Sequence, residues 1–115
     1  MQTLIETLAF LRRAKECGVS EDEREEMVNF IAANPKGGDE MPGTGGARKI
    51  RFARQGQGKR GSYRIITFYS GPDIPVFLLT IYTKNEKEDI SQDQKNALKS
   101  LLKRLPETYR KGEQK

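Results

Sequence analysis

The apolar run Ile74–Tyr82 is the longest in this chain of 115 residues, and it constrains the fold more than any other segment. Read as a strand over Pro75–Thr83, it places apolar side chains on both alternating sets of positions, with Phe77, Leu79 and Ile81 on one set and Val76, Leu78 and Tyr82 on the other. A strand that is apolar on both faces must be covered on both sides. We therefore expect it in the interior of a sheet.

A basic segment, Gly43–Arg64, precedes this run and reads GTGGARKIRFARQGQGKRGSYR. It holds no Asp or Glu, and its cations are Arg48, Lys49, Arg51, Arg54, Lys59, Arg60 and Arg64. Ile50 and Phe52 alternate with basic residues, which is the spacing of a half-buried strand. The sequence therefore predicts a strand over Arg48–Ala53 that carries fixed positive charges.

Two more strands and two connections follow from residue type. The β-branched and aromatic residues of Ser62–Ser70 predict a third strand, and Met1–Glu6 predicts a short edge strand. Gln55–Gly61 is rich in glycine and basic residues, which is typical of the connection in a hairpin. Lys36–Gly46 contains five glycines and is expected to be a loop.

Three helices are indicated by apolar spacing and by their ends. The first runs from Leu8 to Cys17 and ends at Gly18, a residue suited to a helix C-terminus. Ser20 and Glu23 form a capping-box sequence for the second helix. That helix ends at Asn34-Pro35, because a residue before proline avoids helical backbone angles.

The last helix is predicted from its cap and its apolar stripe. Ser91 and Gln94 cap its start, and the stripe consists of Leu98, Leu101, Leu102 and Leu105. We expect Pro106 to interrupt the helix and the tail from Glu107 to fray. The resulting order, β-α-α-β-β-β-α, indicates one small α+β domain with a mostly antiparallel four-stranded sheet.

Charge is distributed unevenly along the chain. Residues 41–70 carry seven Lys or Arg and no acidic residue, whereas residues 1–40 carry nine acidic residues and five basic ones. A basic block fixed to a strand within a neutral or acidic remainder predicts a localised site for phosphates. A basic surface of no particular function is the alternative.

Several classes of site are excluded by composition. The chain contains no histidine, which removes Ser/His and Cys/His catalytic pairs and the usual zinc and iron sites. The single cysteine, Cys17, has no partner for an internal disulfide. Glu86, Glu88 and Asp89 are expected to be a solvated turn and not a metal site. We expect no metal and no cofactor.

The sequence contains neither a dinucleotide-binding motif nor a membrane-spanning or secretion signal. Gly56–Gly61 matches the GxGxxG dinucleotide pattern by letter, but that motif opens a helix, and here Ser62–Tyr69 reads as a strand. The apolar run is too short to cross a bilayer, and Glu6 breaks any signal-peptide pattern. We expect a cytoplasmic protein without a membrane partner.

Tyr82, Lys84 and Asn85 follow one another at the end of the interior strand, with Tyr82 and Lys84 on the same face. As structure, they are a strand end fraying into solvent. As function, the tyrosine could stack on a base while the lysine binds a phosphate. Residue type alone leaves both interpretations open.

Three linked stretches, GTGGARKIR, GKRGSYRIITFY and FLLTIYTKNEKEDIS, together resemble the RelE/ParE superfamily of bacterial toxins, nearest its HigB/RelE branch. The resemblance covers nearly the whole chain, including the loop NPKGGDEMPG and the final helix. It implies a sheet flanked by helices and a metal-independent endoribonuclease that cuts mRNA in the ribosomal A site. It also implies a cognate antitoxin, normally encoded nearby, and a helix-turn-helix DNA-binding protein would fit a HigB-like pair.

Without histidine, lysine and arginine must supply the chemistry, as the resemblance implies. A lysine surrounded by cations loses its proton more readily, and arginine suits a phosphate. Arg64 is then the candidate for stabilising the phosphate, Lys49 or Lys84 is the candidate base, and Tyr82 would stack on or orient the substrate base. The candidates for contact with mRNA or ribosomal RNA are Arg48, Arg51, Arg54, Lys59, Arg60 and Asn85.

Two alternatives follow from the same superfamily. ParE-type members poison DNA gyrase and cut nothing, so one alternative is a gyrase inhibitor. The other is an inactive relative that only binds RNA or its antitoxin. The concentrated phosphate-binding residues favour the nuclease, because a gyrase inhibitor does not need them.

Overall fold

A computed structural model describes residues 3–53, 62–83 and 89–113, with side chains up to residue 109. In chain order, the elements are β1 (Leu4–Glu6), α1 (Leu8–Glu16), α2 (Glu21–Ala33), β2 (Asp39–Glu40), β3 (Ala47–Phe52), β4 (Tyr63–Phe68), β5 (Val76–Thr83) and α3 (Gln92–Glu113). The α+β class expected from the sequence is confirmed.

The described strands form one sheet in the order β1-β5-β4-β3-β2. Strand β1 pairs in parallel with β5, and the other neighbours are antiparallel. The interior position of β5 and the edge position of β1 are confirmed, while β4 occupies the middle.

The sheet has one strand more than the sequence predicted. The extra strand, β2, has two residues and lies inside the segment expected to be only a loop. It pairs with β3 through Asp39 opposite Lys49 and Glu40 opposite Arg48. Two residues are too few to show an alternating pattern, so the sequence gives no signal for this strand.

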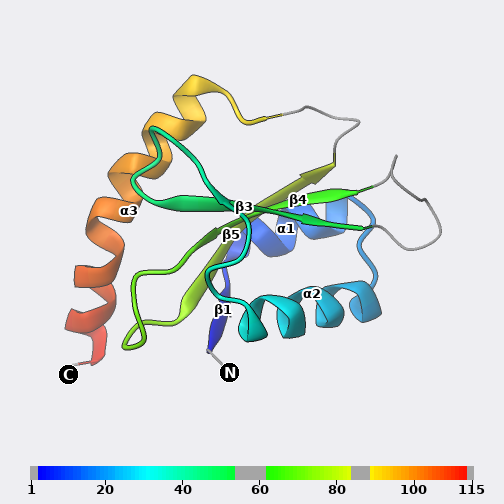
Figure 1. The fold of residues 1–115 in the computed structure, drawn as a ribbon, viewed down its shortest axis with the longest axis horizontal. Coiled ribbons are helices and arrows are strands. Elements are labelled where there is room, and N and C mark those ends of the chain that lie inside the picture. Colours follow the sequence, from blue (N-terminus) through cyan, green and yellow to red (C-terminus); the bar gives the residue numbers. More distant parts are fainter. Residues whose placement is uncertain (1–2, 54–61, 84–88, 114–115) are drawn as a thin grey trace.

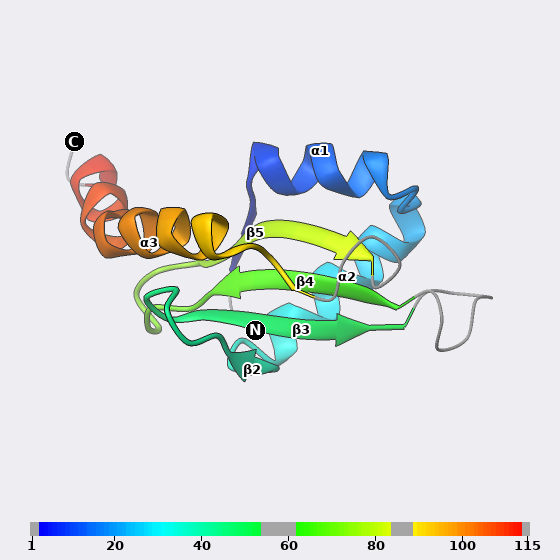
Figure 2. The ribbon, with the colours of Figure 1, turned by 90° about the horizontal axis from the view of Figure 1, so that it is seen from above.

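Helices cover both faces of the sheet, as Figures 1 and 2 show: α1 and α2 lie on one face and α3 lies on the other. Each face has its own apolar core. The first contains Phe10, Met27 and Ile31 from α1 and α2, together with Val76, Leu78 and Ile81 from β5. The second contains Leu102 from α3 and Phe77, Leu79 and Tyr82 from β5. Both faces of β5 are therefore covered, as expected. The predicted alternation is wrong at its end, however, because Ile81 and Tyr82 lie on the opposite faces from those expected, beyond the shift in register between β4 and β5 at Ile66 and Thr67.

The helix starts follow the predicted caps. In α2 the Ser20 hydroxyl accepts from the Glu23 N–H at 3.1 Å, and the Glu23 carboxylate accepts from the Ser20 N–H at 3.2 Å. Ser91 and Gln94 make the same reciprocal pair ahead of α3. Helix α1 has a cap that was not predicted, because the Thr7 hydroxyl accepts from the Phe10 N–H.

The predicted break at Pro106 is wrong, because α3 continues through it to Glu113. Proline has a helical φ and removes only one backbone hydrogen bond, although its ring also crowds the preceding turn. Packing on both sides of the proline compensates: Leu105 and Tyr109 contact the second core, and the Tyr109 ring lies edge-on to Phe77, with 6.2 Å between the ring centroids. Despite the length of α3, the described part of the chain contains no helix that is both long and apolar enough to cross a membrane.

Candidate nucleic-acid interface

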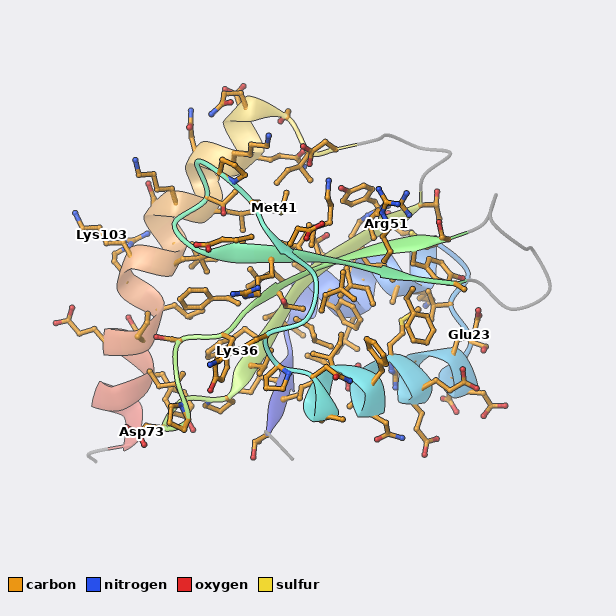
Figure 3. The ribbon with its side chains drawn as sticks, in the orientation of Figure 1. Glu23, Lys36, Met41, Arg51, Asp73 and Lys103 are labelled. Carbon is orange, nitrogen blue, oxygen red and sulfur yellow. The ribbon has the colours of Figure 1, made fainter. Side chains whose placement is uncertain are left out.

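Arg51, Arg64 and Tyr82 form a row across three neighbouring strands. Arg51 on β3 pairs with Arg64 on β4, and Arg64 pairs with Tyr82 on β5. Side chains of directly opposed residues project from the same face of a sheet. Tyr82 belongs to the core beneath α3, so the row lies on that face. Figure 3 shows Arg51 on the side of the sheet away from α2 and its Glu23.

Lys49 lies two residues before Arg51 on β3 and therefore on the same face. We call Lys49, Arg51, Arg64 and Tyr82 the cationic face. Lys49, Arg64 and Tyr82 are candidate catalytic residues and Arg51 is a candidate RNA contact, and the sheet brings all four together.

Arg64 is the most buried cation of this face, with 6% of its surface exposed. Its Nη1 donates a hydrogen bond to the Ser62 hydroxyl at 2.7 Å. Within the described residues, its guanidinium makes no ion pair with a carboxylate. Burying an arginine is costly unless its charge is paired, and within the described residues the only partner of the Arg64 guanidinium is the neutral Ser62 hydroxyl.

Tyr82 is almost fully buried, with 1% exposed. Burial, together with the nearby Asp89 charge, raises the pKa of its hydroxyl to about 12, although the Arg64 charge acts in the opposite direction. The hydroxyl therefore stays protonated at neutral pH and cannot serve as a base. In this arrangement, little of the ring surface is open for a nucleobase to stack on.

Carboxylates that the sequence analysis did not place at the site lie beside Lys49. The Lys49 Nζ lies 3.8 Å from Asp89 Oδ1, and the Lys95 Nζ lies 3.2 Å from Asp89 Oδ2. Around these groups is a pocket of about 210 Å³, lined by Asp39, Glu40, Met41, Pro42, Lys49, Arg51, Asp89 and Lys95. The pocket lining thus contains three cations and three carboxylates. All three carboxylates come from outside the basic segment, which contains no Asp or Glu.

Asp89 remains ionised in this setting. Its partial burial acts to raise the pKa of the carboxyl, but the hydrogen bond from the Ile90 N–H, the hydrogen bond from Lys95 and the charges of Lys49 and Lys95 outweigh it. The net effect lowers the pKa below its ordinary value of 3.8. The expectation of a solvated turn therefore misses the role of Asp89 in an ion-pair network.

Arg48 does not join the cationic face. It neighbours Lys49 on β3 and so projects from the opposite side of the sheet. Its Nη1 donates to the carbonyl oxygens of Lys36 at 3.0 Å and Gly38 at 3.4 Å. Arg48 thus holds the loop between α2 and β2. The other candidates, Arg54, Lys59, Arg60, Lys84 and Asn85, lie outside the described residues.

The described residues form a small α+β protein with three cations and a buried tyrosine on one face of its sheet. A family model described as "RelE toxin of RelE / RelB toxin-antitoxin system" matches residues 3–113. The chain therefore belongs to the RelE family of toxins, as the resemblance in its sequence predicted. Membership of a toxin–antitoxin family implies an antitoxin partner.

Proposed function

We propose that this toxin is a ribosome-dependent endoribonuclease that cleaves mRNA in the A site. The observation that carries the proposal is the row Arg51, Arg64 and Tyr82 with Lys49 beside it. These residues gather cationic donors on one rigid sheet face, where they can bind a phosphate in a fixed position.

The reaction is attack of an mRNA 2′-hydroxyl on the adjacent phosphate. A bond forms between the 2′ oxygen and phosphorus, and the bond from phosphorus to the 5′ oxygen of the next nucleotide breaks. The products are a 2′,3′-cyclic phosphate and a free 5′-hydroxyl. The 2′-hydroxyl gives up a proton, the leaving oxygen takes one, and charge accumulates on the phosphate between these events.

The cationic face matches these needs group by group. Arg64 stabilises the charge on the phosphate, because its guanidinium is always protonated and is held by Ser62. Arg51, on the neighbouring strand, binds the RNA backbone. Lys49 and Lys84 are the candidates for proton transfer. Tyr82 lies opposite Arg64 in the row and is neutral and buried, so its role is to orient Arg64 and not to stack on a base of the substrate.

The proposal is tested in cells by changing Arg64. Expression of the toxin in a bacterial host without its antitoxin is expected to stop incorporation of labelled amino acids while DNA supercoiling stays normal. Arg64→Ala is expected to abolish growth arrest, since loss of one phosphate-stabilising donor costs on the order of a hundredfold or more in rate. Arg12→Ala removes the same charge from the exposed side of α1 and serves as the control.

Two results would overturn the assignment. One is an Arg64→Ala protein that is expressed normally and remains fully toxic. The other is loss of negative supercoiling with translation intact, which would indicate a gyrase inhibitor. If Arg12→Ala were as inactive as Arg64→Ala, the effect would not be specific to the cationic face.

A further inference from the structure

Asp89 joins two elements of the fold at the edge of the cationic face. It lies between β5 and α3, and its Oδ1 accepts a hydrogen bond from the Ile90 N–H at 2.8 Å. The same oxygen lies 3.8 Å from Lys49 Nζ on β3, and Oδ2 lies 3.2 Å from Lys95 Nζ on α3. A single carboxylate is therefore held from two sides and faces the lysine of the candidate site.

We propose that Asp89 is a positioning residue that holds the Lys49 ammonium at the cationic face, with Lys95 holding Asp89 in place. This inference rests on the proposed nuclease function and deepens it. Lys49 needs such support because a lysine side chain has four rotatable bonds and binds as a flexible point charge. The neighbouring Arg64 is held by burial and by Ser62 instead.

The network is poorly suited to a purely stabilising role. The side chains of Lys49 and Asp89 are 25% and 40% exposed, and ion pairs that are open to water contribute little to stability. Helix α3 also packs on the sheet through Leu102 and the second core, so its attachment does not depend on this carboxylate alone. The main effect of the network is therefore to fix the position of the Lys49 ammonium.

Other carboxylates near Lys49 could bind its ammonium in a different place. Asp39 and Glu40 also line the pocket, so an unrestrained lysine would have other carboxylates to contact. Lys49 lies two residues along β3 from Arg51, and the contact with Asp89 draws its ammonium toward the start of α3 and away from these other carboxylates. Displacement of a catalytic group by about 1 Å can cost on the order of a hundredfold in rate.

The test is Asp89→Asn, which removes the charge but keeps an oxygen to accept from Ile90. With ribosome-bound mRNA, we expect the maximal cleavage rate to fall about tenfold while the half-saturating toxin concentration changes less than twofold. Asp93→Asn, on the exposed first turn of α3, is the control and should cleave at the wild-type rate. Asp89→Glu should recover part of the rate, and Lys95→Gln should show a smaller loss.

A double variant separates positioning of Lys49 from any other effect. If Asp89 acts through Lys49, adding Asp89→Asn to Lys49→Ala should cause almost no further loss. Full additivity of the two losses would overturn the proposal, as would wild-type cleavage by Asp89→Asn. Urea unfolding of each variant excludes loss of the fold as the cause.

A second readout does not depend on cleavage. Nuclear magnetic resonance relaxation of the Lys49 side chain should show restricted motion in the wild type and faster motion in Asp89→Asn, with Asp93→Asn unchanged. Absence of cleavage by the wild type would refute the proposed function alone, and the relaxation data would still decide this inference. Equal Lys49 mobility in the wild type and Asp89→Asn would overturn it.

Discussion

At the scale of single residues, the most informative side chains are Arg64 and Tyr82, two polar groups buried side by side. Burying a charge costs free energy unless it is paired and hydrogen-bonded. Arg64 has the Ser62 hydroxyl as a partner, but no carboxylate within the described residues. In the proposed function, the phosphate of the substrate supplies the negative charge that these residues do not.

The raised pKa of Tyr82 predicts that the stability of the protein falls at alkaline pH. Its hydroxyl keeps its proton to about pH 12 in the folded protein, whereas an unfolded tyrosine loses it near 10. The folded state therefore binds more protons between these values, and its contribution to stability is complete below pH 10 and is lost as pH rises toward 12. Urea unfolding at pH 8, 10 and 11 should show this decline. Tyr82→Phe should decline less steeply, and an equal slope for the two proteins would contradict the assignment.

At the scale of elements, the short strand β2 shapes the site. It brings Asp39 beside Lys49, and its approach to β3 depends on Gly38. Gly38 has a φ of 79°, and a Cβ there would overlap the Lys49 carbonyl oxygen and lie 2.7 Å from Ile50 Cγ1. Only glycine allows the loop to pass this close to the strand that carries the site.

Gly38→Ala should therefore distort β3 at Lys49. Gly43→Ala is a matched control, since Gly43 has a φ of 78° and no atom within 4 Å of an added Cβ. Both changes should incur the left-handed backbone cost of about 1–2 kcal/mol, and Gly38→Ala should lose roughly 1–3 kcal/mol more through overpacking. Urea unfolding measures both. Equal losses would show that the close contact with β3 does not matter.

The elements themselves were largely predictable, and the exceptions have physical causes. Ser20 with Glu23, and Ser91 with Gln94, are local signals, and both caps form as expected. Pro106 also gives a local signal, but contacts of Tyr109 with Phe77, far away in sequence, outweigh it. A local rule for proline cannot include packing that only the folded chain creates.

At the scale of the whole molecule, the charged residues that lie together in the fold are not the same as those that lie together along the sequence. The sequence correctly indicates a basic strand with Lys49 and Arg51 on one face. Alternation along that strand places Arg48 on the other face, but the sequence does not indicate that Arg48 binds the Lys36 and Gly38 carbonyls of a loop. Nor does the sequence indicate that Asp39, Glu40 and Asp89 lie beside Lys49 and Arg51 of the basic strand.

The row through Arg64 depends on strand register. The pairing of Arg51, Arg64 and Tyr82 requires the observed alignment of β3, β4 and β5, which includes an irregularity between Ile66 and Thr67. A shift of one residue would move a side chain to the other face. Residue types identified the candidate cations, but only the folded sheet shows which of them can act together.

The most direct measurement is cleavage of a defined mRNA by purified toxin, free in solution and bound to ribosomes with an empty A site. The account predicts cuts only on ribosomes, ending in a 2′,3′-cyclic phosphate. The rate should be on the order of a hundredfold or more lower for Arg64→Ala and unchanged for Arg12→Ala. Absence of ribosome-dependent cleavage, or equal cleavage by Arg64→Ala and the wild type, would contradict the assignment of the cationic face as a nuclease site.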